Sequence, residues 1–148
     1  MIRDLTTDDV DEMVALGAVM HEESPLAKYH FNQDRAVYIL NEIIGKEVVF
    51  AAGAFVDGRL AGILVAELTT HLFVDIKIVS DIVFYVSPDR RGAVAGKRLV
   101  DRFKAWGLDV DADITRIQVD AGIDNGRACA FLGHLGFEDK GTSMMIGI

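Results

Sequence analysis

The sequence predicts a single α/β (α+β) domain over residues 1–148, with a mixed β-sheet flanked by helices. The first observation is the length, since 148 residues suit one domain with a sizeable core. The second is a composition of 51% hydrophobic and 26% charged residues, which is typical of globular proteins. The third is the pattern, because segments of strand and helix periodicity follow one another in the order β-α-α-β-β-β-α-β-α-β.

The first half of the chain supplies one short strand and two helices. Met1 to Leu5 reads as the strand, and Thr6 or Thr7 can cap a helix that ends before Pro25. The apolar residues at helical spacing in this helix are Val10, Met13, Val14, Gly17 and Met20. A second helix is predicted from Gln33 to about Ile44.

Three strands should follow. Residues Val48–Val56 and Leu60–Leu68 flank Asp57-Gly58, a dipeptide that strongly favours a two-residue hairpin turn. The third β stretch, Val74 to Val86, is long enough for a bend or bulge to be expected within it.

The second half alternates helix and strand. A helix ends near Gly107, a strand covers Ile114–Val119, and Asp124 or Asn125 caps a helix that Gly136 terminates. The apolar face of this last helix consists of Ala128, Phe131, Leu132 and Leu135. A final β segment is predicted at roughly Met144–Ile148.

Charge and composition argue against several classes of function. A net charge of −8 argues against nonspecific nucleic-acid binding, which needs broad basic surfaces. No apolar run reaches the length of a membrane span and the start lacks a signal-peptide pattern, so we expect no membrane partner and a cytoplasmic location. The single Cys129 fits a reducing compartment. Four scattered histidines and one cysteine predict no metal site.

The segment Phe84–Val100, FYVSPDRRGAVAGKRLV, predicts an anion site. It reads as a strand, a proline-marked stop, a basic turn and the start of a helix, where free N–H groups and the positive dipole end meet. Six of the 15 Lys and Arg residues lie between Arg90 and Lys104, so a phosphate is the expected ligand. Gly96-Lys97 is followed by arginine, which excludes a Walker loop, and two glycines are too few for a dinucleotide fingerprint.

Arg91-Gly-Ala-Val-Ala-Gly96 resembles the pyrophosphate loop of the GNAT superfamily of N-acetyltransferases, whose pattern is Arg/Gln-x-x-Gly-x-Gly/Ala. Asn125 to Phe137 resembles the family's second signature, an asparagine-capped helix ending in Leu-Gly-Phe. The resemblance implies a mostly antiparallel sheet with splayed central parallel strands and about four helices. It also implies acetyl-CoA as acyl donor, a small-molecule or peptide amine as acceptor, and a homodimer.

The resemblance assigns a set of residues to acyl-CoA. Main-chain amides from Arg91 to Lys97 would hold the pyrophosphate, and the strand edge at Phe84 to Val86 would pair with the pantetheine amides. Asn125 would line the same arm while also capping its helix. The predicted acyl-CoA residues are Phe84, Val86, Arg91, Gly92, Ala93, Val94, Ala95, Gly96, Lys97 and Asn125.

Two positions depart from the family pattern. Val94 stands where the first loop glycine falls, so weaker or shifted phosphate binding is expected. Leu132 stands where many members carry a tyrosine that protonates the leaving thiolate. Either another group serves as acid, or the thiolate leaves unassisted. These departures keep an alternative open, an acyl-CoA-binding or regulatory module with little or no catalysis.

Asp81 and Tyr85 are the candidate catalytic residues. Asp81 could accept the proton of the attacking amine, and a solvated strand carboxylate is an equal alternative. Tyr85 would share a face with Asp81 in an unbroken strand and could serve as acid, although an aromatic strand end more often packs. His21-Glu22-Glu23 precedes Pro25, where the family builds its acceptor groove; it could hold a cationic amine or simply be a solvated helix end.

Overall fold

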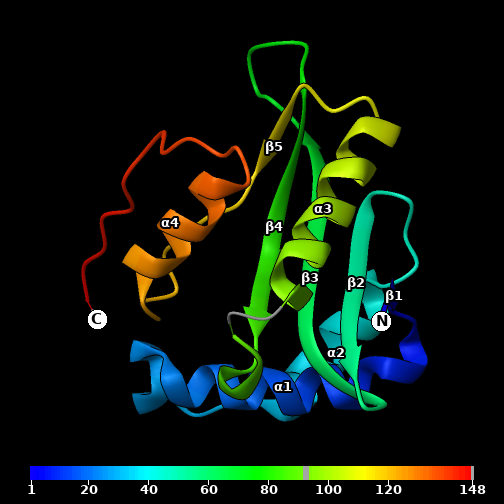
Figure 1. The fold of residues 1–148 in the computed structure, drawn as a ribbon, viewed down its shortest axis with the longest axis vertical. Coiled ribbons are helices and arrows are strands. Elements are labelled where there is room, and N and C mark those ends of the chain that lie inside the picture. Colours follow the sequence, from blue (N-terminus) through cyan, green and yellow to red (C-terminus); the bar gives the residue numbers. More distant parts are fainter. Residues whose placement is uncertain (92–93, 148) are drawn as a thin grey trace.

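The computed structural model describes residues 1–91 and 94–147 and centres on a five-stranded sheet (Figure 1). The strands lie in the order β1-β2-β3-β4-β5, and only β4 and β5 run parallel. Their bounds are β1 Ile2–Asp4, β2 Val49–Val56, β3 Arg59–Thr70, β4 Lys77–Val86 and β5 Ile114–Arg116. This confirms the predicted mixed, mostly antiparallel sheet.

Within residues 1–91 and 94–147, four α-helices and three short 3-10 segments surround the sheet. The α-helices are α1 Val10–Glu23, α2 Gln33–Ile43, α3 Val94–Asp109 and α4 Asn125–His134. The 3-10 segments are η1 Thr7–Asp9, η2 Pro25–Lys28 and η3 Pro88–Arg90. In the described part of the chain, none of the helices is both long and apolar enough to cross a membrane.

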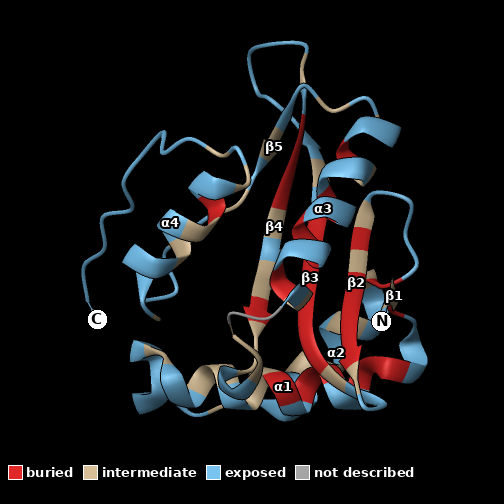
Figure 2. Ribbon diagram, viewed as in Figure 1, coloured by how far each residue is buried: buried red, intermediate tan, exposed pale blue. Residues whose placement is uncertain are grey.

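Both faces of the sheet are buried, which explains the near-continuous apolar run in β3. Ile63 and Val65 pack with Met13 and other residues of α1, whereas Leu64 packs with Phe103 and its neighbours in α3. Figure 2 shows the resulting stripe of buried residues along β2 and β3 and on the sides of α1 and α3 that face them. The sheet is therefore the middle of three layers.

The hairpin and the bulge agree with the sequence. β2 and β3 join at Asp57-Gly58, both with positive φ (52° and 75°), as the two-residue turn requires. In β4, Val83 pairs with Val65 but Asp81 pairs with Ala66, so Ile82 is an extra residue. The expected bulge thus lies at Ile82, in a strand that begins at Lys77 rather than at Val74.

Two predicted strands differ from the structure. The strand predicted over Ile114–Val119 stops at Arg116, because the chain then leaves β4. The strand predicted over Met144–Ile148 is absent from its described part, residues 144–147, where Met144 is 92% and Ile146 fully exposed. An apolar β-prone segment forms a strand only where a neighbour pairs with it and covers it, and β5 ends too early to offer that edge.

The parallel pairing of β4 and β5 is only three residues long. It joins Ile78 to Ile114 and ends where Ser80 pairs with Arg116. Beyond this point β5 leads away toward α4, and the two segments diverge (Figure 1). Among the described residues, the remainder of β4, Asp81–Val86, has no strand on this side. This is the splayed arrangement that the sequence predicted.

An ion pair fixes the entry into α1. The Arg3 guanidinium donates to both carboxylate oxygens of Asp9 at 2.7 and 2.8 Å, and Thr6 N–H donates to Asp9 at 2.8 Å. With the Thr6 hydroxyl accepting from Asp8 N–H, these bonds form a capping structure at η1. The bonds from Arg3 are the main cause that lowers the pKa of Asp9 to about 2.

Asp9→Asn should destabilise the protein by about 2 kcal/mol at neutral pH, because the lowered pKa of Asp9 measures its preference for the folded environment. This contribution is present above the unfolded pKa and is lost as the pH falls from about 4 to 2. Urea unfolding at pH 7 and pH 3 tests the prediction, with the exposed neighbour Asp8→Asn as control. Equal stability of both variants at pH 7 would contradict it.

Candidate functional site

The carboxyl end of β4, the turn before α3 and the last residue of α1 meet at one place in the molecule. Figure 1 shows β4 ending over α1, with the start of α3 beside it. Glu23 comes from α1, Tyr85 from β4 and Arg91 from the turn after η3. These three side chains bond to one another, so we call them the Glu23–Tyr85–Arg91 cluster.

Arg91 makes the largest number of polar contacts in this cluster. Its two terminal nitrogens each donate to one carboxylate oxygen of Glu23 at 2.7 Å, the paired geometry in which arginine binds carboxylates most strongly. Its Nε donates to the carbonyl oxygen of Val86 at 3.0 Å. The guanidinium carbon also lies 5.1 Å from the centre of the Tyr85 ring. Arg91 therefore points back onto the end of β4 and toward α1.

Tyr85 is buried, with 4% of its surface exposed, and its hydroxyl donates to Glu23. Burial, followed by the neighbouring carboxylate, raises the pKa of Tyr85 well above its ordinary value. The pKa of Glu23 is lowered, chiefly by the bonds from Arg91. The cluster thus consists of a protonated phenol, an ionised carboxylate and a guanidinium.

Asp81 lies where β4 and β5 separate. Its Oδ1 accepts a hydrogen bond from Gln118 N–H at 2.8 Å, just beyond β5. Burial raises the pKa of Asp81, with a further contribution from the negative charge of Asp120. A half-buried carboxylate with a raised pKa is a stronger base than an ordinary aspartate, as a general base requires.

The bulge separates the two candidate catalytic residues. Val79 and Phe84 both pack on the α3 side of the sheet although they are five positions apart, while Tyr85 packs on the α1–α2 side. Strand alternation then places Asp81 with Val79, on the face opposite Tyr85. The shared face expected for Asp81 and Tyr85 in an unbroken strand does not exist.

The start of α3 offers the main-chain groups expected at an anion site. Val94, Ala95 and Gly96 form its first turn, where N–H groups have no acceptor within the helix. The Val94 side chain is 58% exposed, so it points away from the core rather than into it. Gly92 and Ala93, also predicted to bind phosphate, lie outside the described residues.

Gly96 lies on the side of α3 that packs against β4 and α4. A Cβ atom at Gly96 would lie 3.5 Å from Phe131, 3.6 Å from Val86 and 3.8 Å from Phe84. Phe84 and Phe131 stack at 6.4 Å between ring centres, which connects β4 to α4. The predicted residues Phe84, Val86 and Gly96 are therefore brought together.

The other predicted polar side chains bond locally. Lys97 forms an exposed ion pair with Asp101 at 2.5 Å, and Asn125 Oδ1 accepts from Gly122 N–H at 3.2 Å. The cap of α4 is Asp124, whose carboxylate accepts from Arg127 N–H. Of the described residues in the basic turn, Arg91 alone is joined to α1, by the bonds to Glu23 described above.

Sequence reasoning did not find the bond between Glu23 and Arg91. The acidic end of α1 was recognisable, but 68 residues separate the two partners and no local pattern relates them. Only the placement of β4 over α1 brings them into contact. The described residues contain no group of three or more His, Cys, Asp and Glu side chains suited to a metal ion.

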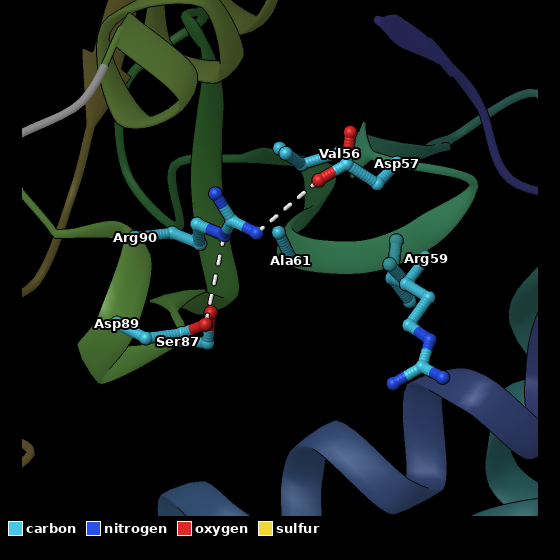
Figure 3. Close-up of a pocket in the computed structure, with 8 residues that line it drawn as sticks. Val56, Asp57, Arg59, Ala61, Ser87, Asp89 and Arg90 are labelled. Atoms are coloured by element: carbon cyan, nitrogen blue, oxygen red, sulfur yellow. Dashed lines mark ion pairs between the residues drawn. The ribbon is translucent and has the colours of Figure 1, made fainter.

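A pocket lies elsewhere, between the β2–β3 turn and η3 (Figure 3). Arg90 extends across it and pairs with Asp57 and Asp89, each at 3.5 Å, while Arg59 points toward α1. Both ion pairs are exposed and long, so they contribute little stability. None of the predicted acyl-CoA or catalytic residues that the structure describes lines this pocket.

Comparison with known proteins identifies the family. Residues 16–137 match the model of the acetyltransferase (GNAT) family, so the chain belongs to this family of acetyltransferases. No curated protein matches the chain.

Solved structures share the fold over the whole chain. A transcriptional regulator from Bacillus halodurans C-125 has a TM-score of 0.82 at 17% identity, covering 100% of this chain and 99% of that one. The ribosomal-protein-alanine N-acetyltransferase from Brucella melitensis biovar Abortus 2308 has a TM-score of 0.75 at 18% identity, with coverage of 100% and 99%. AAC(6')-Iy, in complex with the bisubstrate analogue CoA-S-monomethyl-acetylneamine, has a TM-score of 0.78 at 18% identity, with coverage of 100% and 97%.

Tyr85→Phe should lower the free energy of unfolding by about 1 kcal/mol, because it removes a buried hydroxyl that donates to a carboxylate. Urea unfolding measures the effect. Tyr38→Phe is the matched control, since Tyr38 is 67% exposed on α2. Equal stability of the two variants would show that the bond to Glu23 contributes nothing.

Proposed function

We propose that this protein is an acetyl-CoA-dependent N-acetyltransferase that moves the acetyl group to a primary amine within a ternary complex. The observation that carries the proposal is the edge of β4 from Asp81 to Val86. It has no strand beside it on the β5 side among the described residues, and it ends next to the first turn of α3. Family membership supports the acyl-transfer chemistry.

The described residues fit acyl-CoA in two respects. An unpaired strand edge has N–H and C=O groups that can pair with the amides of a pantetheine arm. The first turn of α3 presents N–H groups and a positive dipole end, which favour a diphosphate. Val94, Ala95, Gly96 and the turn before them would hold the diphosphate, and Phe84 to Val86 would hold the arm. Asn125 and Lys97 would contribute after giving up their local partners.

Asp81 is the proposed proton acceptor. A neutral amine nitrogen attacks the thioester carbonyl, the C–N bond forms, and the C–S bond breaks to release the CoA thiolate. The proton lost by the nitrogen passes to the Asp81 carboxylate, directly or through water, which its raised pKa favours. Positioning of the two substrates contributes most of the rate.

The acid for the thiolate is a separate question. If Tyr85 supplied this proton, its phenol would have to lose the proton readily. The Tyr85 hydroxyl instead donates its hydrogen bond to Glu23, and the pKa of Tyr85 is raised. Leu132, at the family's usual tyrosine position, is buried in the core beside α3. We therefore favour unassisted departure of the thiolate, which its moderate basicity allows.

The alternative is an acyl-CoA-binding module with little catalysis, for which Val94 and Leu132 are the supporting features. Titration calorimetry with CoA tests both readings, since each requires binding. Acetyl-CoA consumption with n-propylamine, spermidine, neamine and Nα-acetyl-lysine amide then separates them. Neamine is included because the bisubstrate analogue on AAC(6')-Iy contains it. An acetyltransferase must turn over at least one amine at a rate that saturates with acetyl-CoA.

Asp81→Asn should reduce kcat at least a hundredfold while changing the Kd for CoA less than threefold, since removing a general base costs roughly 10²–10⁴ in rate. Arg91→Ala should mainly weaken CoA binding. In the wild type, kcat should decrease as the pH falls, because the base must be ionised. The midpoint of this decrease should lie above the ordinary pKa of aspartate, since the pKa of Asp81 is raised. Equal effects of both substitutions on kcat and Kd would overturn these roles.

Val94→Gly should tighten CoA binding by about threefold to tenfold, because the β-branched side chain at the first helical position restricts approach to the N–H groups. Val94→Ala should give an intermediate Kd and serves as the graded control. Calorimetry measures both. Weaker binding by the glycine variant would show that the Val94 side chain contacts the ligand favourably.

A further inference from the structure

We propose that Glu23 binds an ammonium group of the acceptor other than the amine that reacts, and that Arg91 holds this place until a diphosphate draws it away. The inference rests on the proposed function and deepens it. It names one carboxylate as the residue that selects an acceptor with a second, cationic amine.

The end of α1 has the properties of a cation-binding site. Glu23 is its last helical residue, where the exposed main-chain carbonyl groups and the negative end of the dipole favour positive charge. The Tyr85 hydroxyl, which donates to this carboxylate, holds it in place. The pKa of Glu23 is lowered, so the carboxylate carries its charge throughout the neutral range.

A cation already occupies this place, and it belongs to the chain itself. The Arg91 guanidinium pairs with both oxygens of Glu23, and the side chains of Arg91 and Glu23 are 27% and 26% exposed. Solvent, and therefore a small amine, can reach the pair. Exchange of one cation for another leaves the partly buried carboxylate neutralised, which avoids the cost of an unpaired charge.

Arg91 can bind either Glu23 or a diphosphate. It lies in the basic turn that precedes α3, and in this structure it satisfies both Glu23 and the carbonyl of Val86. The Val86 carbonyl belongs to the strand edge proposed for the pantetheine arm. A diphosphate carries more negative charge than one carboxylate, so it can compete for the guanidinium. Its binding would then free both the strand edge and Glu23.

Titration calorimetry with CoA distinguishes this exchange from a merely structural role. If Arg91 is shared, Glu23→Gln releases it, and CoA should bind about threefold to tenfold more tightly than to the wild type. In the Arg91→Ala background the same substitution should have no effect on CoA binding. If Glu23 only supports the fold, Glu23→Gln should weaken CoA binding or leave it unchanged, and that result would overturn the proposal.

Asp4→Asn is the matched control. It removes the carboxylate that accepts from Arg102, and this second arginine–carboxylate pair joins β1 to α3. This pair lies outside the proposed site, so CoA affinity should not change. Glu23→Ala replaces Glu23→Gln in the same comparison if the glutamine variant does not fold.

Steady-state kinetics with spermidine or neamine, whichever turns over, supplies a second readout, because each carries more than one amine. Glu23→Gln should raise the KM for the amine about tenfold and lower the KM for acetyl-CoA. Changes in the same direction for both substrates would overturn the proposal. A wild-type protein that does not bind CoA defeats the proposed function itself. A wild type that binds CoA and acetylates, with no gain of CoA affinity in Glu23→Gln, defeats only this inference.

Discussion

The constraint on which the structure depends is the short parallel pairing of β4 with β5. After Ser80 the two strands separate, and the chain beyond β5 leads to α4, which packs against β4 through Phe131 and Phe84. The carboxyl half of β4 stays held on its other side by β3, as the register from Gly62–Val86 to Ala66–Asp81 shows. A strand paired along one edge and open along the other is a rigid surface that still has free hydrogen-bonding groups.

The extra residue Ile82 determines where side chains point along that half of β4. It turns Tyr85 toward α1 and Phe84 toward α3 and α4, and it leaves Asp81 at the point of divergence, bonded to Gln118. One inserted residue thus assigns the two candidate catalytic side chains to different faces. The proposed proton acceptor, Asp81, and the Glu23–Tyr85–Arg91 cluster are consequently separated by the bulge.

Glu23 connects the layers of the molecule at this end. The Glu23 carboxylate accepts hydrogen bonds from Tyr85 of β4 and from Arg91 in the turn that leads into α3. These bonds join α1, β4 and the basic turn. Such a charge-assisted pair is strong where it is partly shielded from water. Each partner can also bind another ion, the guanidinium an anion and the carboxylate a cation, whenever one comes close. The exchange with substrates that we propose for this ion pair depends on that property.

The sequence by itself determined the local features: the Asp57-Gly58 hairpin, the four helices, the bulge expected in β4 and the basic turn before α3. Each depends on residues close together in the chain, whose spacing or backbone preference is visible in the sequence. Only the tertiary structure decided that Met144–Met145 forms no strand, that Asp81 and Tyr85 lie on opposite faces, and that Arg91 bonds to Glu23. These outcomes depend on which edge, face or charge a distant segment provides, and no local pattern contains that information.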